Sequence, residues 1–263
     1  MKKLALTKGL GIILLLTVLL AACSGNESAP ANETTDDNKG KPQLIQETEH
    51  AQFYSPDSKE DVSEAVTILG EAFENNYKRI TELFRFEAAD KTVIHVYTDK
   101  AEFEKMIGRS TEGTYVAEEN IIKVFTPSDL ADAAVKENYT DQIIHEFVHA
   151  VILQVNSTVG YVKWLDEGSA YYASNQLQKE LQSKTAFLDL PDMDQLTSPE
   201  YFEEAGNTAY FYSGTIIKFI VDKYGEDAWN EILRQPDAIE EILKEPIEGV
   251  YEKWKSYLDN GLS

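Results

Sequence analysis

The helix-forming stretch Asp141–Val155 constrains the fold most, because apolar residues surround it on nearly every side. Such a helix leaves no face for water and must be buried. It nevertheless contains two histidines and a glutamate, namely His145, Glu146 and His149. Buried imidazole and carboxylate groups need polar partners or a bound ion. The rest of the chain must therefore enclose this helix and supply those partners.

The spacing of the two histidines suits a metal site. Residues four apart lie on one face of a helix, so His145 and His149 can direct two imidazoles at one point, as zinc requires. Glu146 is offset by one position, which lets its carboxylate approach a water beside the metal rather than the metal itself. The alternative is a pair of core histidines that are hydrogen-bonded to backbone carbonyls.

A second motif follows a turn at 156–160 and offers a third ligand. It reads Trp164-Leu165-Asp166-Glu167-Gly168-Ser169-Ala170 and belongs to a helix that can return antiparallel to the first. Catalytic zinc sites commonly take two histidines and one glutamate, and they leave the fourth position for water. Glu167 is well placed to be that glutamate. The alternative is that Asp166 and Glu167 begin a solvated helix, near its positive end.

The remaining pattern predicts an α+β fold. A β-branched and aromatic run at Thr92–Tyr97 indicates a strand, and two apolar runs within Thr114–Phe125 suggest a hairpin. After Pro127 the periodicity is almost wholly helical. We therefore expect a small N-terminal sheet, antiparallel or mixed, packed on a mainly helical half that carries the histidine helix. Further helices are expected at Val62–Phe84, Asp99–Met106, Val162–Leu181, Ala209–Tyr224, Glu226–Leu233 and Ile247–Leu258.

The amino terminus has the layout of an export signal. Three lysines precede the apolar run Leu10–Leu20, which is too short for a comfortable membrane span. The run leads into Ala21-Ala22-Cys23, and the whole resembles a bacterial lipobox. The resemblance implies that 1–22 are a lipoprotein signal peptide and that Cys23 is lipidated. The protein would then be anchored on the extracytoplasmic face of the bacterial cell membrane. The alternative is an ordinary signal peptide with an incidental cysteine.

Composition sets the domain plan and excludes some partners. We predict that 23–52 are the lipidated cysteine and a flexible linker, because the residues after Cys23 are mostly polar, and that 53–263 form one domain. The single cysteine excludes an internal disulfide and a multi-thiolate zinc site. A net charge of −22 makes a nucleic-acid partner improbable, because phosphate backbones select for Lys and Arg.

Together, the two motifs resemble those of the gluzincins, the thermolysin-related clan of zinc metallopeptidases. They are most similar to the small bacterial Peptidase MA-like group. The similarity continues through Ala209–Gly214 and Asp222–Gly225 and covers most of 57–260. It implies a zincin-like fold, one Zn²⁺ per chain and a peptide or protein substrate. The implied metal ligands are His145, His149 and Glu167, with Glu146 as the general base that activates water for attack on the peptide bond.

The resemblance also implies a donor for the oxyanion and an edge strand for the substrate. Tyr210 or Tyr212 is the candidate donor, with Tyr210 preferred, and the alternative is that both are core aromatics. Ile121–Phe125 is a candidate for the strand that pairs with an extended substrate. The chain departs from thermolysin-like enzymes at Tyr171, where those enzymes place an aspartate that orients a metal-bound histidine.

Other functions share these motifs. A catalytically inactive, peptidase-like lipoprotein that binds peptide or metal would keep the same fold. Metal capture is disfavoured, because only His50 and His95 lie outside the motif and no histidine-rich tract is present. Hydrolysis of a non-peptide amide, such as cell-wall material, would use the same site with a different cleft.

Overall fold

Residues 41–56, 61–184 and 186–262 are described by the computed structural model of the protein. All of them belong to one unit, Gly40–Ser263. The predicted signal peptide at 1–22 and the lipidated Cys23 lie outside the described residues. Within those residues, no helix combines the length and the apolar character needed to cross a membrane.

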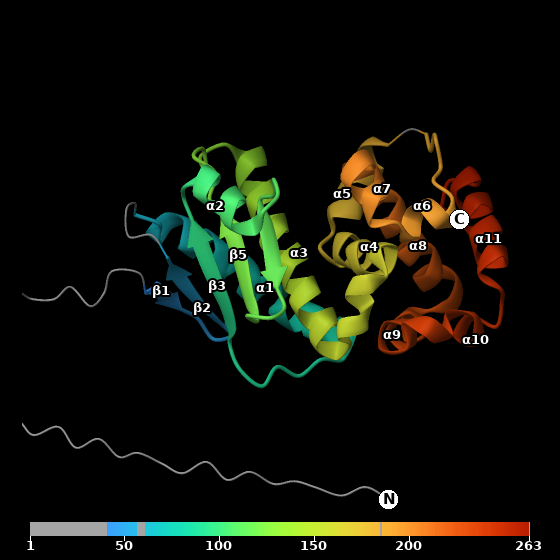
Figure 1. Ribbon diagram of the computed structural model, residues 1–263, viewed down its shortest axis with the longest axis horizontal. Helices are drawn as coiled ribbons and strands as arrows, with labels where there is room; N and C mark the ends of the chain where they lie inside the picture. Colours follow the sequence, from blue (N-terminus) through green and yellow to red (C-terminus); the bar gives the residue numbers. More distant parts are fainter. Residues whose placement is uncertain (1–40, 57–60, 185, 263) are drawn as a thin grey trace, which may run out of the picture. The chain divides into compact units, whose positions relative to one another are not determined.

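A five-stranded mixed sheet forms the N-terminal part of this unit (Figure 1). The strands are β1 (Gln43–Glu47), β2 (Ala51–Ser55), β3 (Thr92–Tyr97), β4 (Gly113–Val116) and β5 (Ile121–Phe125), in the order β1-β2-β3-β5-β4. The three inner strands are parallel to one another, and each edge strand is antiparallel to its neighbour. Ile94 and Val96 alternate into the core along β3, as a strand with one buried face requires.

The structure differs from two predictions, one at each edge of the sheet. β1 lies inside the predicted linker 23–52, so ordered structure begins before Phe53. This strand is largely exposed and is held through backbone pairing with β2, so its side chains show no strong alternation in the sequence. The proposal that Ile121–Phe125 is the substrate-binding edge is wrong, because β5 pairs with β3 on one side and β4 on the other. The edge strand beyond β5 is β4.

Helices and the loops between them make up the rest of the described chain (Figure 1). They are α1 (Ser63–Phe84), α2 (Lys100–Ile107), α3 (Ala133–Val155), α4 (Lys163–Ala173), α5 (Gln176–Ser183), α6 (Met193–Thr197), α7 (Pro199–Ala205), α8 (Asn207–Tyr224), α9 (Glu226–Arg234), α10 (Ile239–Leu243) and α11 (Ile247–Asp259). α1 and α3 pack against each other, and α3 also contacts β4 and β5. On its other side α3 contacts α4, which packs most extensively on α8. The predicted α+β fold is therefore confirmed, with the histidine helix between the sheet and the helical half.

The helix predicted over Val162–Leu181 is interrupted. α4 ends at Ala173, and Asn175 adopts the left-handed backbone conformation with φ of 69°. Asparagine tolerates this conformation better than most residues, so the chain can turn there without a glycine. The turn starts a new helix, α5, at Gln176. This change of direction determines which side chain reaches His145.

Candidate metal centre

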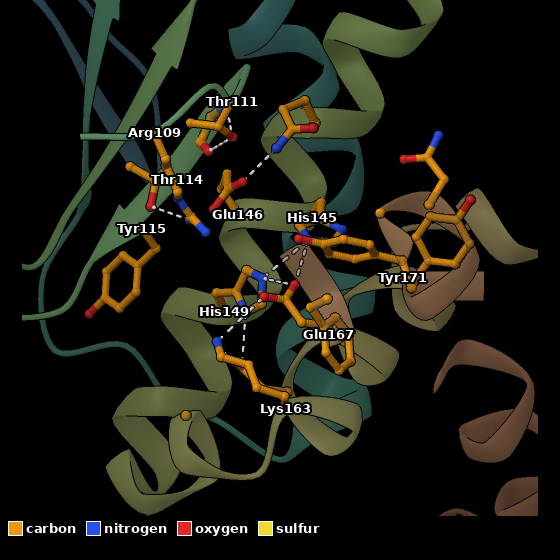
Figure 2. Close-up of a pocket in the computed structure, with 18 of the residues that line it drawn as sticks. Arg109, Thr111, Thr114, Tyr115, His145, Glu146, His149, Lys163, Glu167 and Tyr171 are labelled. Atoms are coloured by element: carbon orange, nitrogen blue, oxygen red, sulfur yellow. Dashed lines mark hydrogen bonds and ion pairs between the residues drawn. The ribbon is translucent and has the colours of Figure 1, made fainter. Parts of the chain in front are cut away.

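A cavity of about 770 Å³ lies where the sheet meets the helical half (Figure 2). One wall comes from β4 and the loop before it, and the opposite wall from α4, α7 and the start of α8. Between these walls, α3 contributes Gln142, His145, Glu146 and His149. The cavity therefore contains every residue of the histidine motif that carries a reactive side chain.

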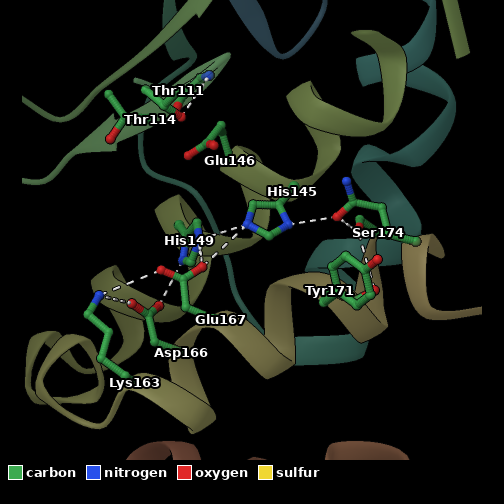
Figure 3. Close-up of polar contacts among 12 residues, drawn as sticks. Thr111, Thr114, His145, Glu146, His149, Lys163, Asp166, Glu167, Tyr171 and Ser174 are labelled. Carbon is green, nitrogen blue, oxygen red and sulfur yellow. Dashed lines mark hydrogen bonds and ion pairs between the residues drawn. The ribbon is translucent and has the colours of Figure 1, made fainter. Parts of the chain in front are cut away.

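The fold brings the three predicted ligands together. The Nε2 atoms of His145 and His149 lie 3.1 Å apart. Glu167 reaches them from α4, with Oε2 at 3.5 Å from His145 Nε2 and 3.2 Å from His149 Nε2. All three side chains are buried and converge on one point (Figure 3). They form a donor group of two histidines and one carboxylate that could hold a metal ion.

The other nitrogen of each imidazole is also engaged. His149 Nδ1 lies 2.7 Å from Asp166 Oδ1, and His145 Nδ1 lies 2.8 Å from Gln176 Oε1. A carboxylate and an amide oxygen can only accept, so each Nδ1 carries the proton and donates it. Each Nε2 then presents a lone pair toward the other histidine and toward Glu167. Three electron-rich atoms this close together require a positive charge among them, so the donor set fits a metal ion.

The pKa shifts within the donor group show the same need for positive charge. Burial by itself lowers the pKa of His149, but the carboxylates of Asp166 and Glu167 raise it well above its ordinary value. Burial by itself raises the pKa of Glu167, but His149 and His145 bring it well below its ordinary value. A proton on His149 thus supplies positive charge at the place where a metal ion would bring it.

Lys163 adds a second positive charge beside the carboxylates. Its Nζ lies 3.6 Å from Asp166 Oδ2 and 3.6 Å from Glu167 Oε1. The Oε2 atom of Glu167 faces the histidines, so the two oxygens of this ligand have different partners. This arrangement favours a carboxylate that offers one oxygen to the metal.

Glu146 lies beside the donor group and beneath the edge strand (Figure 2). Its Oε1 accepts a hydrogen bond of 2.5 Å from Gln142 Nε2. A Cβ atom placed on Gly113 of β4 would come within 3.1 Å of Glu146 Cγ and 3.0 Å of the Gln142 side chain. Glycine therefore lets the edge strand approach the glutamate closely.

The two candidate oxyanion donors lie in different places. Tyr210 lines the cavity, and the centre of its ring lies 6.3 Å from that of His145. Burial raises the pKa of its hydroxyl, with Glu167 adding to the shift, so this hydroxyl keeps its proton near neutral pH. Tyr212 is not brought to the cavity, because it is buried against Trp254 and its hydroxyl donates to the Leu188 carbonyl.

The partners of the histidines were not predicted from the sequence. Tyr171 is not a hydrogen-bond partner of either histidine, because its hydroxyl donates to Glu180 Oε2 at 2.6 Å. The sequence pattern indicates Asp166 only as an acidic residue near the start of a helix. Gln176 was placed in mid-helix, and the signal that could have located it is the Ser174-Asn175 pair, whose residue types favour turns.

Comparisons with known proteins add no relative. The sequence matches no protein-family model and no curated protein. The geometry alone therefore supports a buried site in which two histidines and a glutamate resemble the metal site of the zincins.

Proposed function

We propose that this protein is a zinc-dependent peptidase. The observation that carries the proposal is the convergence of His145, His149 and Glu167, with Glu146 beside them and an open sheet edge above them. The two-histidine, one-carboxylate set is the donor set of many catalytic zinc sites. A purely structural zinc site would more commonly be closed by four protein ligands.

The chain's own side chains supply the remaining chemistry. When bound, zinc supplies a Lewis acid that polarises a carbonyl and makes a nearby water more acidic. Glu146 is positioned to take a proton from water and to pass it to the leaving amine. Gln142 holds the Glu146 carboxylate through one oxygen, which leaves the second oxygen for this transfer. Tyr210 is the donor that would stabilise negative charge on the carbonyl oxygen.

The substrate is proposed to be an extended peptide. β4 is paired only with β5 among the described strands, so its other edge can take up a further strand. The cavity wall includes Gly113, Thr114 and Tyr115 from this strand. A peptide paired with β4 would therefore run past Glu146 and the donor group.

The location of the enzyme is part of the proposal. The lipobox-like sequence around Cys23 supports a lipid anchor on the extracytoplasmic face of a bacterial membrane. An acidic chain with a net charge of −22 would be repelled by anionic headgroups, so attachment would rest on the acyl chains.

Zinc content and peptide cleavage test the proposal together. Elemental mass spectrometry of the purified protein should find about one zinc per chain, and Glu167→Ala should lose it. Glu146→Gln should keep the zinc but cleave peptides from a mixed library about 10²- to 10⁴-fold more slowly than the unchanged protein.

Three results would contradict the proposal. Absence of zinc from the protein even after reconstitution would mean that the donor group does not bind the metal. Cleavage that persists in Glu146→Gln would remove this residue from the mechanism. A zinc-loaded protein that binds peptides from the library without cleaving any would instead be an inactive, peptidase-like binder.

A further inference from the structure

We propose that Gln176 is a positioning residue. Its neutral amide holds the ring of His145 in the orientation that lets this histidine bind the metal. The inference rests on the metal centre of the proposed function. Thermolysin-like enzymes orient a metal-bound histidine with an aspartate at the position where this chain has Tyr171. Gln176 would take over that role here. The hydrogen-bond partner of His145 Nδ1 comes from the next helix, α5, rather than from α4.

The contact between Gln176 and His145 determines which imidazole nitrogen can bind metal. Gln176 Oε1 lies 2.8 Å from His145 Nδ1, which makes Nδ1 the protonated nitrogen. The lone pair is therefore on Nε2, the atom that faces His149 and Glu167. Without the amide, the ring could rotate or change tautomer, and either change would remove a ligand.

The amide itself is held in one orientation. Ser174 Oγ donates to the same Gln176 Oε1 at 3.0 Å, so two donors point at this oxygen. Rotation of the amide by half a turn would direct its NH₂ group at the protonated Nδ1 of His145, which is unfavourable. The turn at Asn175 brings the hydroxyl and the amide together.

α5 is fastened to α3 at a second point. Lys179 lies one turn beyond Gln176, and its Nζ is 2.6 and 2.8 Å from the two oxygens of Asp141. The same ammonium is 2.6 Å from Glu137 Oε1. These ion pairs fix α5 along α3, so that Gln176 faces His145.

A neutral acceptor suits the charge at this site. The cavity already holds the carboxylates of Glu146, Asp166 and Glu167, and Lys163 is the one lysine or arginine paired with them among the described residues. A further carboxylate on His145 would add a negative charge to buried surroundings. An amide oxygen orients the ring without adding that charge.

Zinc affinity measured by chelator competition tests the inference. We expect Gln176→Ala to weaken zinc binding about 10- to 100-fold, as loss of such a hydrogen-bond partner commonly does. Gln176→Glu restores an acceptor for Nδ1 and should recover most of the affinity. The matched control is Gln178→Ala, an exposed glutamine on the same helix, which should bind zinc as the unchanged protein does.

The spectrum of the cobalt-substituted protein separates positioning from simple stabilisation. Gln176→Ala should change the visible absorption bands of bound Co²⁺, because the imidazole ligand is no longer held, whereas Gln178→Ala should not. Equal zinc affinity in Gln176→Ala and the unchanged protein would overturn the inference. So would an unchanged cobalt spectrum together with no recovery of affinity in Gln176→Glu.

The two measurements, zinc affinity and peptide cleavage, distinguish failure of this inference from failure of the proposed function. If the unchanged protein binds zinc and Gln176→Ala binds it more weakly, yet no peptide is cleaved, Gln176 keeps its role and the peptidase assignment falls. If the unchanged protein binds no zinc, both are overturned.

Discussion

Tyr210 and Tyr212 lie two positions apart on α8, and this spacing sends their side chains to different surroundings. Positions two apart differ by more than half a helical turn. Tyr210 therefore lines the cavity near His145, whereas Tyr212 packs on Trp254. Both residues are tyrosines on one helix, so they form a matched pair for testing the oxyanion donor.

Removal of the Tyr210 hydroxyl should slow catalysis and leave metal binding intact. We expect Tyr210→Phe to lower kcat for peptide cleavage about 10²- to 10³-fold, the usual loss when one oxyanion donor is removed. Zinc content should stay at one per chain, because Tyr210 does not belong to the donor group. Steady-state kinetics of the zinc-loaded protein would measure the change.

Tyr212→Phe is the control for this change. It loses a hydrogen bond to the Leu188 carbonyl, which should lower stability slightly but leave kcat within about twofold. Equal losses of kcat in the two variants would contradict a specific role for Tyr210.

At the scale of elements, the most extensive packing in the helical half is between α4 and α8. A Cβ atom on Gly168 would lie only 2.6 Å from the backbone oxygen of Ser213. A backbone atom cannot move aside as a flexible side chain can. The ligand Glu167 is the neighbour of Gly168, so its position depends on this contact.

Gly168→Ala should therefore destabilise the protein. We expect the free energy of unfolding to fall by about 1–3 kcal/mol, the usual cost of overpacking. Gly249→Ala in α11 is the control, because its Cβ would meet only the side chain of Glu245. That variant should stay within about 1 kcal/mol of the unchanged protein. Urea unfolding of the zinc-free proteins measures both, and similar values would argue against tight packing at Gly168.

Polar contacts between His50 and Glu74 attach the turn between β1 and β2 to α1. The backbone N–H of His50 donates to Glu74 Oε1 at 2.8 Å, and its Nδ1 is 2.6 Å from Glu74 Oε2. Burial by itself raises the pKa of Glu74, but the hydrogen bonds from His50 and Thr48 bring it below its ordinary value of 4.5. The ionised carboxylate is thus stabilised in the folded protein.

The sign of this shift predicts how stability changes in acid. A lowered folded pKa gives stability that is present above about pH 4.5 and is lost as the pH falls through the folded pKa. The difference in unfolding free energy between the unchanged protein and Glu74→Gln should therefore shrink below that pH. Glu71→Gln, an exposed change on the same helix, is the control for titrations by denaturant. A difference that grows on acidification would contradict the expected sign.

The elements that the sequence predicted best are those whose signal is local. β3 has the predicted bounds, and α1 and α11 nearly so, because their apolar periodicity is set by residues close in sequence. The order of strands could not be predicted, because it depends on pairing between distant segments. That is why composition makes Ile121–Phe125 a candidate for the open edge, whereas the structure places it inside the sheet.

The site was predictable to a similar degree. Helical spacing predicts His145 and His149, the second motif after the turn predicts Glu167, and the structure brings all three together. Gln176 could not be found in this way, because its contact with His145 depends on one left-handed residue at a helix break. Tyr210 and Tyr212 could not be separated without knowing which side of α8 faces the cavity.

At the scale of the whole molecule, one cysteine determines the proposed attachment. Cys23 is the only thiol of the chain, so lipidation has no competing cysteine. We expect the unchanged protein to fractionate with membranes and Cys23→Ser to be released, as detergent-phase partition would show. Ser24→Ala keeps the cysteine and serves as the control. Persistence of Cys23→Ser in the membrane fraction would rule out the lipid as the anchor.

The metal donors, their hydrogen-bond partners and Glu146 all belong to one continuous stretch, 142–176, which runs from α3 through α4 to the first residue of α5. Contacts between residues close in sequence cost little loop-closure entropy and form early in folding. The sheet instead depends on parallel pairing between distant strands, which is slower. A refolding chain should therefore gain affinity for metal before β4 is in place to receive a substrate, so metal loading would precede completion of the cleft.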